Sequence, residues 1–152
     1  MNTKVTKNWT IEINEKDVFA RCTNETLYQS YVRSNNKEEA IVMQDDDYGQ
    51  FHVYFTNAVA NLHILLARRM YEQPYPCGCD EDRKIIFDLY MHDNHDDNMI
   101  PILTAHCYDY LVKQILEQWF HADFGSQLAR LEINHCLHYR KHPVRRRLDP
   151  LI

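Results

Sequence analysis

The stretch that decides the fold is DDDYGQFHVYFTNAVANLHILLARRM, residues 45–70. Its apolar residues recur at intervals of three and four, which is the spacing of one face of an α-helix. These residues are Phe51, Phe55, Ala58, Val59, Leu62, Leu65, Leu66 and Met70. Three aspartates precede the helix and suit the positive end of its dipole, and Pro74 and Pro76 lie beyond its end. The sequence therefore predicts a helix of roughly twenty residues with one buried face.

Two other stretches alternate between apolar and polar residues, as β-strands do. In the first, residues 9–13, Trp9, Ile11 and Ile13 share one side. In the second, RKIIFDLYM at residues 83–91, one side carries four apolar residues, namely Ile85, Phe87, Leu89 and Met91. We expect the two stretches to pair as a small two-stranded β element.

Three more helices are predicted, over residues 15–32, over 99–120 and from about 123 to a point before Pro143. Asn14 stands where the first would be capped, and Gly125 lies near a break. The expected buried residues are Val18, Cys22, Tyr28 and Tyr31 in the first, Tyr108, Leu111, Val112, Ile115 and Trp119 in the second, and Phe124, Leu128, Leu131 and His135 in the third. The expected fold class is mainly α, of α+β type: about four helices in a bundle with the β element.

Length and charge indicate one domain with a cationic end. The chain has 152 residues, enough for a single core. Its formal charge is −5, but residues 138–152 hold five Lys or Arg and one Asp, so they carry +4 and the preceding 137 residues carry −9. We predict a helical domain over residues 1–139 and a basic C-terminal arm over residues 140–152.

The arm contains the predicted partner-binding residues, which are Arg140, Lys141, Arg145, Arg146 and Arg147. Arginine side chains suit phosphate or carboxylate groups, so the arm fits either DNA or an acidic protein. The strongly acidic remainder of the chain would repel a nucleic acid. An acidic protein surface, including that of a second copy in a head-to-tail ring, therefore fits better.

No apolar run approaches the ~20 residues of a membrane span, and residues 1–10 lack the apolar core of a signal peptide. The five cysteines are an odd number and favour reduced thiols. We expect a soluble protein made in the cytoplasm.

Candidate metal ligands are Cys77, Cys79, His92 and His95. Structural zinc sites usually separate their cysteines by two to four residues, whereas Cys77 and Cys79 are separated by one, so the match is weak. Acidic residues near His92 and His95, such as Asp93, Asp96 and Asp97, leave open a metal-binding protein or a metal-dependent nuclease. Solvated loop residues are the simpler interpretation, and we expect no cofactor.

The motifs of the common enzyme classes are missing. The sequence has no G-x-S-x-G elbow, no G-x-x-x-x-G-K-[ST] phosphate loop and no G-x-G-x-x-G dinucleotide motif, and it has only three glycines. We therefore expect a protein that is not an enzyme.

Five segments carry a resemblance to a group of known proteins. They are WTIEINEKDVFA at 9–20, the stretch at 45–70, IIFDLYM with HDNHDDN at 85–98, DYLVKQILEQWF at 109–120 and LHYRKHPVRRRL at 137–148. Their order resembles that of small, mostly uncharacterised proteins encoded in the virion structural gene clusters of tailed bacteriophages and prophages. The resemblance implies a non-enzymatic role in virion assembly, as a head-to-tail connector or tail-completion protein, with incorporation into the virion. A nucleic-acid-binding module using the same arm is the main alternative.

Overall fold

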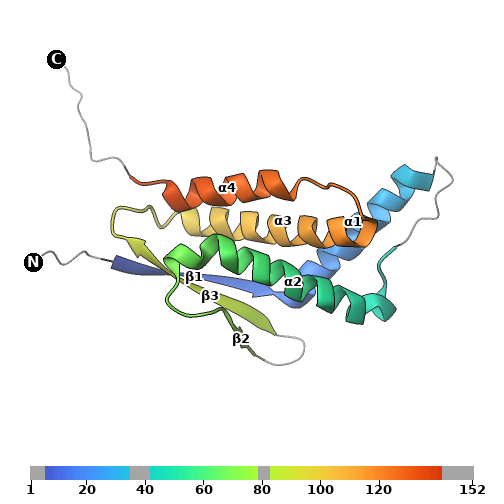
Figure 1. Ribbon diagram of the computed structural model, residues 1–152, viewed down its shortest axis with the longest axis horizontal. Helices are drawn as coiled ribbons and strands as arrows, with labels where there is room; N and C mark the ends of the chain where they lie inside the picture. The colour runs from blue at the N-terminus through green and yellow to red at the C-terminus, as the bar shows by residue number, and fades with distance from the viewer. Residues whose placement is uncertain (1–5, 35–41, 79–82, 142–152) are drawn as a thin grey trace, which may run out of the picture.

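The computed structural model describes residues 6–34, 42–78 and 83–141. Along the chain they form strand β1 (Thr6–Asn14), helix α1 (Glu15–Ser34), a 3-10 turn η1 (Asp45–Asp47) and helix α2 (Tyr48–Leu66). A second 3-10 turn η2 (Ala67–Arg69) and strands β2 (Tyr75–Cys77) and β3 (Lys84–His92) follow. Helices α3 (Met99–Phe120) and α4 (Ser126–His138) complete the fold (Figure 1). The described part is therefore mainly helical with a small antiparallel sheet, as predicted.

The sheet has three strands in the order β1-β3-β2, not two. β1 and β3 pair antiparallel along their whole length, with Ile11 opposite Phe87, which confirms the predicted pairing. The additional strand, β2, is short and contains Pro76, so its sequence resembles a loop. Pro76 is tolerated because β2 is an edge strand, where a missing backbone N–H does not interrupt the sheet.

One face of the sheet forms the floor of the core. Trp9, Ile11 and Ile13 on β1 are buried, and the residues between them on the other face, Thr10 and Glu12, are exposed. The helices cover the inner face, with α3 in contact with α1, α2, α4 and β1. α4 lies alongside α3 at the top of Figure 1, and β2 is the lowest element. The fold is thus a layer of helices on one face of a small sheet.

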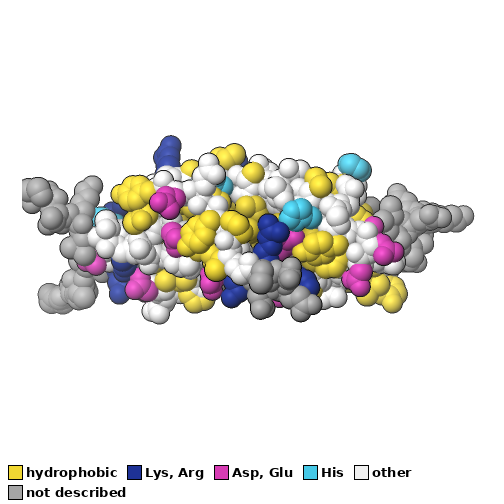
Figure 2. All heavy atoms as spheres, turned by 90° about the horizontal axis from the view of Figure 1, so that it is seen from below, with side chains coloured by type: hydrophobic (Ala, Val, Ile, Leu, Met, Phe, Trp, Pro, Cys, Tyr) yellow, Lys and Arg dark blue, Asp and Glu magenta, His cyan; other side chains and the backbone are white. Residues whose placement is uncertain are grey.

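Figure 2 views the molecule from the side of β2. Hydrophobic side chains form several separate groups there, with cationic and acidic side chains between them. This side carries no continuous field of one charge sign over the part that the figure colours. In the described part of the chain, no helix is both long and apolar enough to cross a membrane.

The predicted face of α2 is confirmed. Phe51, Phe55, Ala58, Leu62 and Leu66 are buried, and Val59, Leu65 and Met70 pack against the core. In α3, Tyr108, Leu111 and Ile115 are likewise buried, with Val112 and Trp119 partly buried against them.

The predicted face of α1 is correct only in its first half. Val18 and Cys22 are buried, but Tyr28 and Tyr31 are 60% and 71% exposed, and the inner face continues through Thr26 and Ser30. Both hydroxyls can be buried because each has a hydrogen bond: Thr26 Oγ1 donates to the Thr23 carbonyl and Ser30 Oγ to that of Leu27. The predicted cap is confirmed, since Asn14 Oδ1 accepts from the backbone N–H groups of residues 16 and 17.

The prediction for the last helix was wrong about both its start and its face. α4 begins at Ser126, and Gly125 adopts a left-handed conformation with φ of 88°. The residues that face the core are Ser126, Ala129, Ile133, Cys136 and Leu137, whereas Leu128 and Leu131 are exposed. The sequence carries two competing apolar stripes here, and the one that contains the small Ala129 lies against α3.

A pair of substitutions tests this face. Ile133→Ala should lower the free energy of unfolding by about 2–5 kcal/mol, because Ile133 is fully buried. Leu131→Ala should change it by no more than about 0.5 kcal/mol, because Leu131 is 63% exposed. Urea denaturation measures both, and equal costs at the two positions would contradict the orientation of α4.

Candidate functional site

The root of the predicted basic arm lies against the body of the protein. After α4 ends, the backbone N–H of Tyr139 donates to the His135 carbonyl at 3.0 Å. The backbone N–H of Lys141 then donates to the carbonyl of Asn94 at 2.8 Å, in the turn between β3 and α3. The side chains of Arg140 and Lys141 are exposed. Arg145, Arg146 and Arg147 lie outside the described residues.

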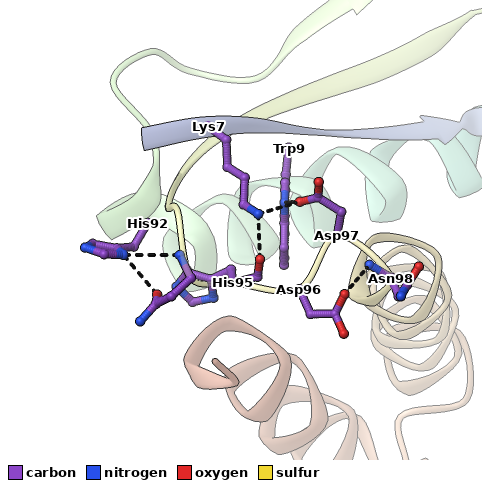
Figure 3. A network of polar contacts seen from close by, with 8 residues as sticks. Lys7, Trp9, His92, His95, Asp96, Asp97 and Asn98 are labelled. Carbon is purple, nitrogen blue, oxygen red and sulfur yellow. Dashed lines mark hydrogen bonds and ion pairs between the residues drawn. The ribbon is translucent and has the colours of Figure 1, made fainter. Parts of the chain in front are cut away.

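A polar network fixes the turn that holds this root (Figure 3). The indole N–H of Trp9 donates to Asp97 Oδ1 at 2.9 Å, and Lys7 Nζ lies 3.0 Å from the same oxygen. Lys7 Nζ also donates to the His95 carbonyl at 2.6 Å. The hydrogen bonds from Trp9 and Lys7 lower the pKa of Asp97. Because both donors belong to β1, the turn is attached to the sheet as well as to α3.

The structure does not bring the described candidate metal ligands together. Cys77 pairs with Lys84 at one end of β3, whereas His92 is at the other end of the same strand, eight residues or about 27 Å away. His92 Nδ1 lies 2.9 Å from Asn94 Oδ1. Cys79 lies outside the described residues. Within the described ranges no three His, Cys, Asp or Glu side chains are placed to hold a metal ion, and the four cysteines there form no disulfide.

His95 is part of the core rather than a surface ligand. It is fully buried, and its ring meets that of Trp9 edge-on with centroids 5.7 Å apart. No described residue makes a hydrogen bond to either of its ring nitrogens. Burial lowers the pKa of His95, and the charge of Arg69 and, to a smaller extent, that of Arg140 lower it further. The folded protein therefore holds this imidazole in its neutral form.

This burial predicts acid sensitivity. An unfolded histidine titrates near its ordinary pKa of about 6.5, so the unfolded chain binds a proton that the folded chain excludes as the pH falls below that value. The stability is therefore complete above about pH 6.5 and is lost as the pH falls toward the lower folded pKa, by up to about 1.4 kcal/mol per pH unit. We expect His95→Phe, which retains a ring against Trp9, to reduce this loss in urea denaturation measured at a series of pH values.

The matched control is His135→Phe, because His135 is an exposed residue of α4. It should retain the pH dependence of the natural sequence. If His95→Phe also retained it, the acid sensitivity would have to arise elsewhere.

A cationic groove lies between the end of α2 and the last three turns of α4. Its volume is about 560 Å³. The residues that line it are Ile64, Leu65, Arg68, Arg69, Arg130, Asn134, Leu137 and His138. Three of these are arginines and none is acidic. Ile64, Leu65 and Leu137 line it as well, so the groove combines positive charge with apolar surface.

Arg69 connects this groove with the root of the arm. Its guanidinium donates to the carbonyl of Leu137 at 3.0 Å, which links η2 to the end of α4. Arg140 follows Leu137 by three residues. Burial lowers the pKa of Arg69, and the charge of Arg140 lowers it further. Arg68 and Arg130 are exposed and available to a partner. The groove and Arg140 therefore lie at the same end of α4, and we call them together the cationic end.

The groove could not be predicted from the sequence, because its residues come from the α2–η2 segment and from α4, which are about sixty residues apart in the chain. A partial signal existed in α4, where Arg130, Asn134 and His138 are four residues apart and thus share a helix face. Nothing in the sequence indicated that Arg68 and Arg69 would face them.

Comparisons of the chain with protein-family models, with curated proteins and with solved structures found no match.

Proposed function

We propose that this protein is a non-enzymatic assembly protein whose cationic end docks onto an acidic surface of a partner protein. The observation that carries the proposal is the groove lined by Arg68, Arg69 and Arg130, which lies at the end of α4 from which the arm begins. Charge complementarity selects an acidic partner, and the apolar residues of the groove add contacts that a purely charged surface would not offer.

The resemblance of the sequence to virion-cluster proteins extends this proposal. In that setting the partner is another virion protein or a second copy of this chain, and the role is that of a connector or tail-completion protein. Arg145, Arg146 and Arg147 would then prolong the cationic end along the partner's surface.

A nucleic acid is the alternative partner. Phosphate groups would also bind these arginines, but Ile64 and Leu137 in the groove offer nothing specific to a phosphate backbone. The acidic remainder of the chain would in addition repel DNA.

Fluorescence anisotropy distinguishes the two kinds of partner. It uses two probes, an amphipathic peptide of glutamate and leucine and a single-stranded DNA oligonucleotide. We expect the peptide to bind more tightly than the DNA and to retain part of its affinity at high salt, because apolar contacts are not screened. DNA binding that exceeds peptide binding and falls steeply with salt would instead support the nucleic-acid alternative.

A further inference from the structure

A second, smaller cavity lies away from the cationic end, between the start of α1, the middle of α2 and the β2–β3 hairpin. Its volume is about 270 Å³. The residues that line it are Glu15, His52, Phe55, Thr56, Val59, Pro76, Arg83 and Ile85. Sites for drug-sized ligands usually begin at about 300 Å³. The cavity is therefore suited to a molecule of only a few heavy atoms.

A buried carboxylate lies at this cavity. Glu15 is the first residue of α1 and is only 2% exposed. Its Oε2 accepts hydrogen bonds from the Tyr48 hydroxyl at 2.7 Å and from His52 Nδ1 at 2.8 Å. Burial and the bond to Glu15 raise the pKa of Tyr48, so the hydroxyl remains a donor. Oε1 is buried and has no hydrogen-bond partner in the described part of the protein.

An unpaired buried carboxylate oxygen is costly, because it has lost water without gaining a donor. Tyr48 contributes no charge to the site, and Glu15 and Arg83 line the same cavity. The cavity therefore presents one anionic and one cationic side chain. This pair points to a ligand that carries an ammonium group and a carboxylate.

His52 presents a polar atom to such a ligand. Because a carboxylate only accepts, the contact with Glu15 places a proton on Nδ1, and in the neutral ring Nε2 is then an acceptor. The His52 side chain is 42% exposed and lines the cavity. An ammonium group can thus donate to Nε2 while it is attracted by the charge of Glu15 behind the ring.

Arg83 supplies the opposite charge in the same cavity. Its carbonyl accepts from the backbone N–H of Glu15 at 3.3 Å, so the two residues are neighbours. Its side chain is exposed, and a guanidinium group binds carboxylates in a bidentate manner. Phe55, Val59 and Ile85 add apolar wall between the charged groups.

We propose that this cavity binds a small apolar α-amino acid. The ammonium group lies against His52 and the field of Glu15, the carboxylate lies on Arg83, and the side chain packs on the apolar wall. In an α-amino acid the ammonium and carboxylate groups are bonded to the same carbon. This matches a cavity that offers a donor, Arg83, and an acceptor, His52, close together. This binding is independent of the cationic end and of the function proposed for it.

Isothermal titration calorimetry with glycine, L-alanine, L-valine and L-leucine tests the proposal. We expect saturable binding of at least one of the apolar amino acids. The analogues isoamylamine, which lacks the carboxylate, and 4-methylpentanoate, which lacks the ammonium group, should bind at least about 10-fold more weakly than L-leucine, since each loses a charged hydrogen bond.

Two variants locate the site. Arg83→Gln and His52→Phe should each raise the dissociation constant by about 10-fold or more. The control Arg68→Gln, in the cationic groove, should leave it unchanged. Binding of none of the four amino acids, binding of either analogue as tight as that of L-leucine, or an unchanged dissociation constant in the Arg83→Gln variant would each overturn the proposal. Because Arg83 is exposed, its variant should remain folded, which circular dichroism verifies.

Discussion

Reversing the charge of Arg68 and Arg130 together should raise the dissociation constant for the acidic peptide by about 100-fold or more. Both side chains are exposed, line the same groove and come from different helices, so one acidic segment can meet both. Each charged hydrogen bond contributes about 1.5–3 kcal/mol, and two such losses correspond to at least about 100-fold in affinity. Fluorescence anisotropy of the Arg68→Glu/Arg130→Glu variant measures this change.

The matched control is Lys16→Glu/Arg21→Glu, which makes the same change in net charge on α1. It should alter the dissociation constant by no more than about 3-fold, through long-range electrostatics alone. Equal losses in the two double variants would mean that the peptide responds to net charge and that the groove is not its site.

Replacing Trp9 with alanine should lower the free energy of unfolding by about 3–5 kcal/mol, the largest loss that we expect from any single substitution. Trp9 belongs to β1 and is 1% exposed, and its ring packs against that of His95 in the turn before α3. Its indole N–H also holds Asp97 at 2.9 Å, so alanine removes a hydrogen bond as well as volume. Urea denaturation gives the change in free energy.

Trp9→Phe separates the two contributions. It retains most of the volume and removes the N–H donor, so it should be less destabilising than Trp9→Ala by at least about 1 kcal/mol. Leu128→Ala, at a residue that is 60% exposed, serves as the control and should change the stability by no more than about 0.5 kcal/mol. If Trp9→Ala lowered the free energy of unfolding no more than this control, β1 would not be the floor of the core.

The elements with one dominant apolar pattern were predictable from the sequence. The stripe from Phe51 to Leu66 was specific because five residues spaced by three and four along that helix are all buried. The alternation in residues 9–13 and 85–91 determined which residues face the core, since a shift of one residue would turn them all outward.

The errors arose where a local pattern was ambiguous. In α4, Leu128 and Leu131 form a stripe as plausible in sequence as that of Ala129 and Ile133, and the contact with α3 decides between them. In β2, Pro76 looked like a break because the edge position that tolerates it is a property of the assembled sheet.

The candidate site was predictable only in part. The charge of the C-terminal region drew attention to Arg140 and Lys141, but the groove beside them depends on the tertiary fold that brings η2 and the end of α2 close to α4. The metal hypothesis linked Cys77 with His92 because both lie near the same strand in the sequence, whereas an extended strand holds its two ends far apart.

The most direct test of the central claim is a map of backbone amide chemical shifts during titration with the acidic peptide. Our account predicts that the changes concentrate in residues 64–69 and 130–141, which form the groove and the root of the arm. Changes confined to other surfaces, or no changes at peptide concentrations that saturate the anisotropy signal, would contradict it.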